Sequence, residues 1–513
     1  MALPDLIEIM PLDKPVRAEI TVPGSKSITN RALILAALAN GEVTLEGALW
    51  SEDTQIMVEC LQNLGFMVNV ASDPDEICNR TITVYGQGGK VPGGGTAENP
   101  LELFVGNAGT AARFLSALVC LGKGVYRLHG APRMHERPQA ALFKALRALG
   151  YRVDAPNDKL PATIFGGGSR SRGDETHSSK ESQRLLTSSP TSKVKVSIEE
   201  SSQFASALLL CAKTGSWEIK VVGENAEESP YVAMTTKMIE TFPKSGGKFQ
   251  IEPDASSGSY FWAAGKIGPE SPESLEYSPR FGIDVQTKYF SNVIIARWPN
   301  SDWQVDERFP GFLDMGPMAH GVPDFRKKWE DIAKKGKAEI EKSVHDFINS
   351  SKGKISRRHD LGDSIMTAIV IAPLAPWAFQ NEFTKFTDLG RLRVQECERV
   401  VALRTELTKC GAKVVEEGDT LTVYSSQLHG AEIETYNDHR MAMCFAILGL
   451  KVPGIKIKNP ACVKKTFPNF FQKLAAPPPK GLGATILDAK TGRKLELKEL
   501  FADRDFSNLK LKT

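Results

Sequence analysis

The chain has 513 residues, with 64 Lys or Arg against 61 Asp or Glu, so its formal net charge is only +3. This balance argues against a nucleic-acid coat or a membrane-surface protein, but it leaves small anionic ligands open. Hydrophobic residues make up 41% of the chain, which is typical of a globular protein with a large core and more than one domain. We therefore expect neither a nucleic-acid partner nor a membrane partner.

The cysteines and the N-terminus give an expected location. Eight cysteines are scattered along the chain without a C-x-x-C pair, which is typical of reduced, mostly buried thiols in a cytoplasmic protein. The N-terminal stretch MALPDLIEIMPLDKP has no basic region followed by a long apolar run, so it does not predict a secretory signal. No His/Cys/Asp cluster has metal-ligand spacing, and we expect no metal.

The first predicted elements are a strand over 18–22, a Pro-Gly turn, and an apolar helix that ends at Gly41. Lys26, Ser27 and Arg31 fall at the start of this helix. Free backbone N–H groups and the helix dipole favour anions at such a position. The simpler interpretation is a capping serine with two solvated cations.

This stretch is not a nucleotide-binding P-loop. That motif requires Gly, four residues and Gly-Lys-Ser/Thr. Here Ser25 precedes Lys26, and Glu19 stands where the first Gly would be. The stretch predicts an anion site of another kind.

A helix, a glycine turn and a β-like stretch recur along the chain. The clear copies are MVECLQNLGFMVNV (57–70), ALFKALRALGYRVDAP (141–156) and ALRTELTKCGAKVVEEGDTLTV (402–423), with weaker copies at 235–253 and 470–488. The turn glycines are Gly65, Gly150, Gly246 and Gly411, with Gly481 or Gly483 near the end. A missing copy would lie near Gly336. Glycine after a helix is ordinary, but the repetition predicts α/β units, three to a domain.

Three stretches look inserted. Residues 166–192 are rich in Gly and Ser with few apolar residues, which predicts a mobile loop, and residues 265–282 are similar. Residues 314–359 are charged and partly helical, and we expect them to decorate the surface.

Polar clusters occur at predicted turns in the first half of the chain. GNAGTAARF (106–114) is a glycine-rich turn opening a helix, where Gly109 would let the backbone approach an anion. GAPRMHERP (130–138) places two arginines, Arg133 and Arg137, in a loop bounded by prolines. EESSQFASALLL (199–210) heads another apolar helix, although serines there are often plain caps.

Four more clusters follow in the second half: DLGDSIMTA (360–368), RLRVQECERV (391–400), TYNDHRMAM (435–443) and VKKTFPNFF (463–471). Each has a simple structural interpretation, such as a surface pair of Arg399 with Glu396 or a solvated lysine pair. Together they predict a ligand with two anionic groups, because the arginine fork binds phosphate and carboxylate. Two carboxylates, Asp363 and Glu396, remain for proton transfer.

These segments, together with DASSGSYF (254–261), resemble in order the signature segments of the 5-enolpyruvylshikimate-3-phosphate (EPSP) synthase family. The resemblance covers about residues 12–163, 194–264 and 357–475. It implies two α/β domains, each an inside-out α/β barrel of three similar units. The expected domains are 23–253, and 1–22 together with 254–513. It also implies a cytoplasmic monomer that uses no cofactor.

The family transfers the enolpyruvyl group of phosphoenolpyruvate to the 5-hydroxyl of shikimate 3-phosphate and releases phosphate. The catalytic residues that the resemblance implies are Asp363, which accepts the hydroxyl proton, Glu396, which protonates the methylene carbon, and Lys26. The implied contacts with shikimate 3-phosphate are Lys26, Ser27, Arg31, Ser201, Ser202, Gln203, Tyr231 and Asp363. The implied contacts with phosphoenolpyruvate are Lys26, Gly109, Arg133, Gln203, Arg399, Arg440 and Lys465.

The chain departs from the family pattern at four positions. Gln395 replaces a Lys before the catalytic Glu, and Arg391 replaces an Asn. Glu228 stands where a Ser is usual, although Ser229 is adjacent, and Ala233 replaces an Asp. We expect Arg391 or Arg393 to make up for the charge lost at Gln395.

Two alternatives remain at this point. UDP-N-acetylglucosamine enolpyruvyl transferase is a sister family with the same fold and chemistry, but it carries a reactive Cys in the loop where this chain has GAPRMHERP. The other alternative is a catalytically weakened homologue that only binds ligands.

Overall fold

The computed structural model describes residues 3–167, 192–223, 229–269, 293–315, 354–374 and 383–502. The chain divides into two compact units. The first unit is Pro23–Glu252, and the second unit is Met1–Val22 together with Pro253–Thr513.

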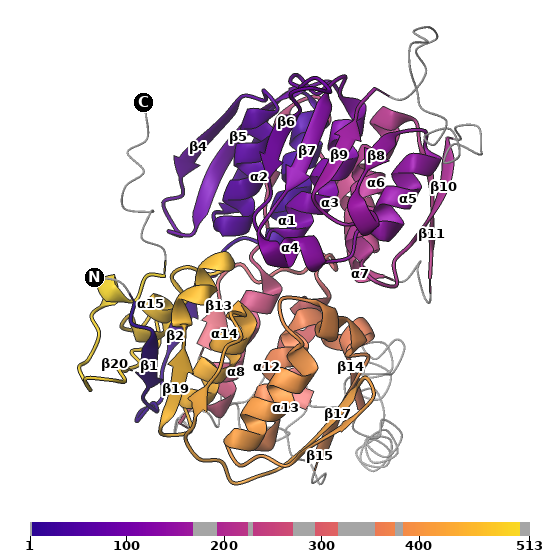
Figure 1. The fold of residues 1–513 in the computed structure, drawn as a ribbon. Coiled ribbons are helices and arrows are strands. Elements are labelled where there is room, and N and C mark those ends of the chain that lie inside the picture. Colours follow the sequence, from indigo (N-terminus) through magenta and orange to yellow (C-terminus); the bar gives the residue numbers. More distant parts are fainter. Residues whose placement is uncertain are drawn as a thin grey trace, which may run out of the picture. The chain divides into compact units, whose positions relative to one another are not determined.

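The first unit contains two four-stranded sheets, ordered β12-β3-β5-β4 and β6-β7-β9-β8, and the parallel pair β10-β11 (Figure 1). Its strands are β3 (Asn40–Leu49), β4 (Val68–Ser72), β5 (Asn79–Gln87), β6 (Leu101–Phe104), β7 (Val125–His129), β8 (Arg152–Asp154), β9 (Ala162–Phe165), β10 (Lys193–Ser197), β11 (Glu218–Val222) and β12 (Gly247–Gln250). Its helices are α1 (Lys26–Leu38), α2 (Glu52–Asn63), α3 (Gly109–Leu118), α4 (Pro132–Glu136), α5 (Ala140–Ala148), α6 (Ser202–Gly215) and α7 (Pro230–Thr241).

Three helices form the centre of the first unit. Every residue of α3 is buried, as are residues 28–37 of α1 and most of α6. A helix that is apolar on all sides must be enclosed, whereas strands such as β10 alternate between buried and exposed residues. The helices therefore lie inside and the sheets outside, as expected for an inside-out barrel.

The second unit repeats this plan with sheets ordered β18-β19-β1-β20 and β14-β15-β17-β16 and the pair β13-β2. Its strands are β1 (Leu6–Ile9), β2 (Ala18–Ile20), β13 (Val293–Ile295), β14 (Lys354–Ser356), β15 (Phe383–Thr387), β16 (Val414–Glu417), β17 (Thr420–Tyr424), β18 (Glu432–Ile433), β19 (Ile455–Lys458) and β20 (Ile486–Asp488). Its helices are α8 (Ala255–Ile267), α9 (Phe309–Met315), α12 (Ile365–Ile371), α13 (Arg399–Lys409), α14 (His439–Gly449) and α15 (Phe470–Ala475).

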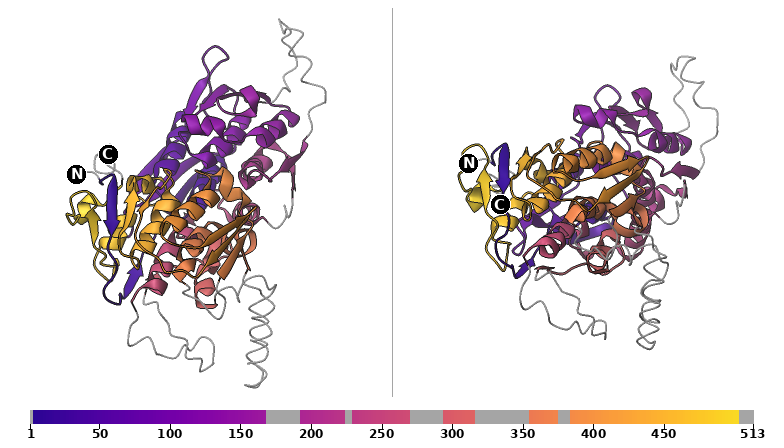
Figure 2. Two further views of the ribbon diagram at one scale, coloured as in Figure 1. Left: turned by 60° about the horizontal axis from the view of Figure 1, so that its bottom comes forward. Right: turned by 90° about the horizontal axis from the view of Figure 1, so that it is seen from below.

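In the second unit, α8, α12 and α14 are the buried central helices. The two ends of the chain complete one of its sheets, since β1 pairs antiparallel with both β19 and β20. Figure 2 shows this indigo strand among the yellow C-terminal elements. The second unit thus needs residues from both ends of the chain.

The helix–glycine–strand repeats are confirmed. Gly65, Gly150, Gly246 and Gly411 follow α2, α5, α7 and α13, and all four have positive φ between 87° and 95°. In the last copy the turn residue is Gly483, with φ 70°, rather than Gly481. The copy expected near Gly336 lies outside the described residues.

Some predicted boundaries were wrong. The first helix ends at Leu38, and Gly41 belongs to β3, because the strand begins directly after the helix. Residues 265–267, which we expected in an insertion, complete α8. Residues 354–359 were expected at the surface, but β14 pairs with β15 and Arg357 is buried. The rest of 314–359 lies almost wholly outside the described residues, as does most of 166–192.

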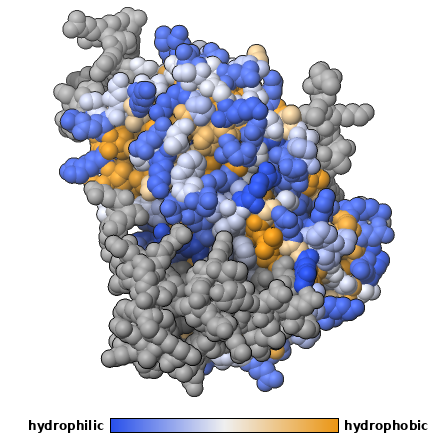
Figure 3. Space-filling model, turned by 180° about the vertical axis from the view of Figure 1, so that it is seen from behind, coloured by the Kyte–Doolittle hydropathy of each residue, from blue (hydrophilic) through white to orange (hydrophobic). Residues whose placement is uncertain are grey.

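The described surface is mostly polar. On the face shown in Figure 3, hydrophobic residues lie in small patches among hydrophilic ones. None of the helices in the described ranges is both long enough and apolar enough to cross a membrane.

Candidate active site

The starts of the central helices come together in the first unit. Arg31, on the second turn of α1, donates to the Thr235 hydroxyl of α7 at 2.7 Å and to the Ser206 hydroxyl of α6 at 3.0 Å. Gln203 at the start of α6 donates to Thr110 at the start of α3 at 3.2 Å. These contacts lie at similar depths from each N-terminus, so α1, α3, α6 and α7 begin at the same end of the unit. Their dipoles favour an anion at that end.

Arg31 is a buried cation that links α1 to α6 and α7. It is 2% exposed, and it also donates to the Ser27 carbonyl at 2.8 Å. Its partners are neutral oxygens, so burial lowers the pKa of Arg31 to about 10, although the nearby Tyr231 phenol partly offsets this. Arg31 is therefore not the solvated cation of the simpler interpretation.

Lys26, the first residue of α1, extends its ammonium to Asp53 at 3.0 Å. The Lys26 side chain is 20% exposed and that of Asp53 is 5% exposed. Ser25 occupies the cap position without a side-chain capping bond, and Ser27 is partly exposed on the same turn. The ammonium is held at the helix start but still reaches solvent.

Gly109 is the first residue of α3, and two arginines surround it. A Cβ at Gly109 would lie 2.5 Å from Arg113 Nη1 and 2.7 Å from Arg137 Nη2, so a side chain there would displace both guanidinium groups. Arg113 also donates to the Gly109 carbonyl at 3.1 Å, and Arg137 to the Asn107 carbonyl at 3.3 Å. Two guanidinium groups therefore lie against the backbone at the start of α3.

The structure does not bring Arg133 to this pocket. Arg133 lies on α4 with 49% of its side chain exposed, and it forms an ion pair with Glu136 one turn later. Because α4 ends at Glu136, Arg137 leaves the helix and turns back toward Gly109. Of the two arginines in this loop, Arg137 lies against Gly109, whereas the sequence analysis assigned Arg133 to the ligand.

The serine cluster at α6 serves partly as a cap. Ser201 is the N-cap, and its hydroxyl accepts from the Gln203 backbone N–H at 3.2 Å. Ser202 is buried at the first helical position. Ser229 is the N-cap residue of α7, directly before Pro230 and Tyr231. Glu228 lies outside the described residues.

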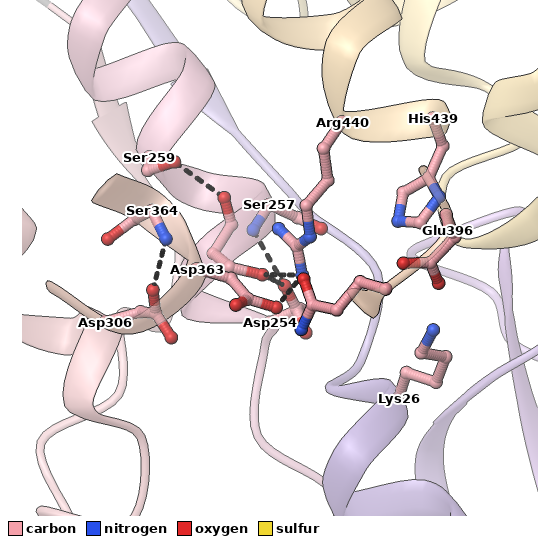
Figure 4. A network of polar contacts seen from close by, with 12 residues as sticks. Lys26, Asp254, Ser257, Ser259, Asp306, Asp363, Ser364, Glu396, His439 and Arg440 are labelled. Atoms are coloured by element: carbon pink, nitrogen blue, oxygen red, sulfur yellow. Dashed lines mark hydrogen bonds and ion pairs between the residues drawn. The ribbon is translucent and has the colours of Figure 1, made fainter. Parts of the chain in front are cut away.

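In the second unit, Asp363 lies just before α12 and binds two arginines. Arg357 Nη2 is 2.5 Å from its Oδ1, and Arg440 Nη2, at the start of α14, is 3.2 Å from its Oδ2 (Figure 4). Burial alone would raise the pKa of Asp363, but the two guanidiniums outweigh it and hold the pKa well below its usual range. Asp363 is thus an ionised carboxylate.

Glu396, Arg399 and Lys465 form one connected group. Arg399 donates to Glu396 Oε2 at 2.8 Å, and Lys465 donates to Glu396 Oε1 at 3.0 Å. Lys465 is buried, whereas Lys464 is exposed, so only Lys464 fits the solvated-lysine interpretation. The spacing of Glu396 and Arg399 is that of a surface pair, but Arg399 is only 1% exposed.

Asp438 holds Arg399 from the other side. As the N-cap of α14 it accepts from the Arg440 backbone N–H at 2.9 Å, and its carboxylate binds Arg399 Nε at 2.7 Å. Burial lowers the pKa of Arg399, but Asp438 and Glu396 outweigh it and raise that pKa above its ordinary value. The TYNDHR turn therefore links the start of α14 to the Glu396 group.

The departure at Gln395 has a local consequence. The Gln395 side-chain oxygen accepts from Arg399 Nη1, an acceptor that a lysine would not supply. Arg393 binds Glu398 at 2.7 Å and Glu416 at 2.8 Å, so it is committed to the β16–β17 hairpin. Of the two arginines proposed to compensate for Gln395, Arg391 is the remaining candidate.

The sequence reasoning missed three residues in these clusters. Arg137 was noted but not assigned, and Arg357 and Asp306 carried no motif. Asp306 reaches the Asp363 turn by accepting from the Ser364 backbone N–H at 2.6 Å, from 58 residues away. No local sequence signal marks Asp306. No cluster of three or more His, Cys, Asp or Glu in the described ranges could hold a metal.

The fold is shared with solved enolpyruvyl transferases. A solved EPSP synthase from Acinetobacter baumannii matches with a TM-score of 0.60 and 18% identity, covering 94% of this chain and 99% of that one. The enolpyruvyl transferase NikO from Streptomyces tendae matches with a TM-score of 0.55 and 13% identity, covering 96% and 99% of the two chains. At these identities the likeness shows the fold.

Sequence similarity is stronger. The family model described as EPSP synthase (3-phosphoshikimate 1-carboxyvinyltransferase) matches residues 12–271 and 323–474, and the chain belongs to this family. The 3-phosphoshikimate 1-carboxyvinyltransferase of Trichormus variabilis is 34% identical over 491 residues, covering 91% of this chain and 98% of that protein. The protein of the same name from Opitutus terrae is 34% identical over 485 residues, covering 93% and 98%.

Proposed function

We propose that this protein is an enzyme that transfers the enolpyruvyl group of phosphoenolpyruvate to the 5-hydroxyl of shikimate 3-phosphate, giving 5-enolpyruvylshikimate 3-phosphate and phosphate, in chorismate and aromatic amino-acid biosynthesis. The observation that carries this is the match to relatives of that name over nearly their whole length.

The first-unit cluster would bind the anionic groups of the substrates. Its members are Lys26, Ser27, Arg31, Gly109, Arg137, Ser201, Ser202, Gln203 and Tyr231. Converging helix starts and the two guanidinium groups beside Gly109 supply hydrogen-bond donors there. Phosphate groups are bound well by such donors. Arg137 takes the place that we had assigned to Arg133.

The second-unit cluster would carry the proton transfers. Asp363, ionised beside its two arginines, would accept the 5-hydroxyl proton as the oxygen attacks C2 of phosphoenolpyruvate. Glu396 would give a proton to C3, and the Lys465 ammonium at 3.0 Å is a proton source within reach. Arg399, Arg440 and Lys465 would stabilise the charge on the phosphoenolpyruvate groups.

The product keeps a carbon–carbon double bond, so the proton added to C3 must be balanced by a later loss. In the second step the C2–O bond to phosphate breaks while a proton leaves the new methyl group, and Glu396, by then a carboxylate, would accept it. Phosphate departs with the electron pair of the broken bond and would take up the proton that Asp363 holds. Glu396 then regains the proton it gave and Asp363 regains its charge, so the reaction balances.

Two further properties are proposals. All eight cysteines fall within the described ranges and are free thiols, which supports a reducing, cytoplasmic location. We also expect a monomer.

One assay separates the proposed function from its alternatives. Phosphate release from phosphoenolpyruvate is measured with shikimate 3-phosphate, then with UDP-N-acetylglucosamine, and with and without a metal chelator. We expect release only with shikimate 3-phosphate and no effect of the chelator. Release with the nucleotide sugar would assign the sister activity, and no release with either acceptor would indicate a ligand-binding homologue.

A further inference from the structure

A second buried aspartate, Asp306, lies directly beside the Asp363 turn. It sits in the 3-10 turn Val305–Arg308, which lies between the two stretches that match the family model. Its Oδ1 accepts from the backbone N–H of Ser364 at 2.6 Å, and the residue is 6% exposed (Figure 4). Asp306 therefore contacts the residue that immediately follows the proposed base.

Asp306 also meets the residue that precedes the base. Gly362 has φ 53°, and a Cβ there would lie 2.6 Å from Asp306 Oδ2. Asp306 thus packs against both neighbours of Asp363, and the turn that presents the base is shaped around its carboxyl group. A side chain at Gly362 would displace that carboxyl.

The two aspartates have opposite electrostatic environments. Asp363 binds Arg357 and Arg440, whereas Asp306 accepts from the neutral backbone N–H of Ser364. Burial raises the pKa of Asp306, the charge of Asp363 raises it further, and together they bring it to about 7. Pairs of acids whose environments separate their pKa values are typical of acid–base sites.

The other charged groups on the elements packed around Asp306 are accounted for. Arg440 attracts the Asp306 charge but binds Asp363, and Asp254 caps Ser257 at 2.7 Å. The remaining groups are Glu307 and Arg308 of its own turn, and Arg358, His359 and Asp360 of the π-helical turn Arg357–Leu361. Asp360 accepts from the Ser356 N–H at 2.7 Å, and Arg308 donates to the His359 carbonyl at 2.7 Å.

We propose that Asp306 is a positioning residue for the reaction, which in its ionised form fixes the Asp363 turn and makes Asp363 a stronger base. This rests on the proposed function. Two arginines weaken Asp363 as a base, and a negative charge beside it opposes them. An ionised carboxylate also holds the Ser364 N–H more strongly than a neutral one. When Asp306 takes up a proton, both effects weaken.

The sign of the pH dependence follows. Asp306 is neutral below a pH of about 7 and ionised above it, so kcat should rise with pH through this range. Asp363 stays ionised throughout, because its pKa is far lower. The rise of kcat on the acidic side of the pH profile should then report the ionisation of Asp306 and not that of Asp363.

The test compares kcat at saturating substrates from pH 5.5 to 9 in the wild type, Asp306→Asn and Asp302→Asn. The Asn side chain can still accept from Ser364 but carries no charge, so it imitates protonated Asp306 at every pH. We expect kcat of Asp306→Asn at pH 8.5 to fall roughly ten- to a hundredfold with little change in either KM, since a general base is weakened but not removed. Its profile should lose the step near the Asp306 pKa.

Asp302→Asn is the control variant. Asp302 is exposed in the same segment with φ 59°, which Asn tolerates, and Asp302→Asn should keep the wild-type profile. The substrate phosphates titrate alike in all three proteins, so only a difference between profiles counts. A wild-type profile in Asp306→Asn would overturn the inference, whereas an inactive wild type would overturn the proposed function instead. If Asp306→Asn does not fold, Gly362→Ala should show the same loss, and wild-type kinetics there would also overturn the inference.

Discussion

Two fully buried arginines, one in each unit, have opposite partners. Arg31 of the first unit donates to hydroxyl and carbonyl oxygens, and its pKa falls to about 10 because burial is not offset by a carboxylate. Arg399 of the second unit binds Asp438 and Glu396, and its pKa rises despite burial. The buried arginine of the first unit thus has only neutral partners in these contacts, whereas the buried arginine of the second unit is balanced by two acids.

This difference suggests a division of work. Excess donors at converging helix starts are suited to binding phosphate, which brings its own negative charge. Acids held against arginines and a lysine are suited to moving protons, because small changes nearby alter which group holds the proton. We infer that the first unit supplies the donors for the phosphate of shikimate 3-phosphate, and that the second unit supplies the acids and bases that transfer protons.

The largest expected effect is on the free energy of unfolding, when the N-cap residues Asp438 and Ser201 are each replaced by Ala. Asp438 is fully buried with Arg399, so Asp438→Ala leaves a buried cation without its main partner and should lower the free energy of unfolding by about 3–5 kcal/mol. Ser201→Ala removes only a neutral cap and should cost about 1 kcal/mol. Urea denaturation of the two variants measures both, and equal losses would contradict the contrast.

Next in size is the effect of removing the base. Asp363→Asn keeps hydrogen-bonding groups near Arg357 and Arg440 but cannot take up the hydroxyl proton. It should lower kcat by about a hundredfold or more with a smaller effect on KM. Steady-state phosphate release is the measurement. Near-normal turnover would remove Asp363 from the mechanism.

The two arginines of the 130–138 loop give a matched pair. Arg137 lies at Gly109, and Arg137→Gln should raise the KM for phosphoenolpyruvate roughly ten- to a hundredfold through loss of a charge-assisted contact. Arg133 pairs with Glu136 in solvent, and Arg133→Gln should change KM by less than about threefold, since surface pairs contribute little. The reverse order would restore the original assignment to Arg133.

The smallest expected effect concerns Arg391. If its charge replaces the lysine absent at Gln395, Arg391→Asn should raise the KM for phosphoenolpyruvate by up to about tenfold, less than a full charge-assisted contact. Kinetics identical to the wild type would show that Gln395 simply leaves a weaker cationic group around Arg399.

Local sequence patterns were sufficient for the repeated units, because a helix stop, a positive-φ glycine and a strand are encoded within about 20 residues. They could not separate Arg133 from Arg137, which share one loop and differ only in whether α4 has ended. Nor could they place Asp306 or Arg357, whose importance comes from contacts with the Asp363 turn. The end of α1 was misplaced because glycine often follows a helix, whereas Gly41 lies in β3, which begins directly after α1.

Titration calorimetry with shikimate 3-phosphate tests the division of work most directly. In the second unit, Glu396→Gln should abolish most turnover, because proton transfer is lost. The variant should still bind this substrate with a Kd within about threefold of the wild type, because the residues that bind the phosphate group are unchanged. In the first unit, Ser202→Ala should weaken binding about tenfold or more by removing a phosphate donor. Weak binding by Glu396→Gln together with wild-type binding by Ser202→Ala would contradict the account.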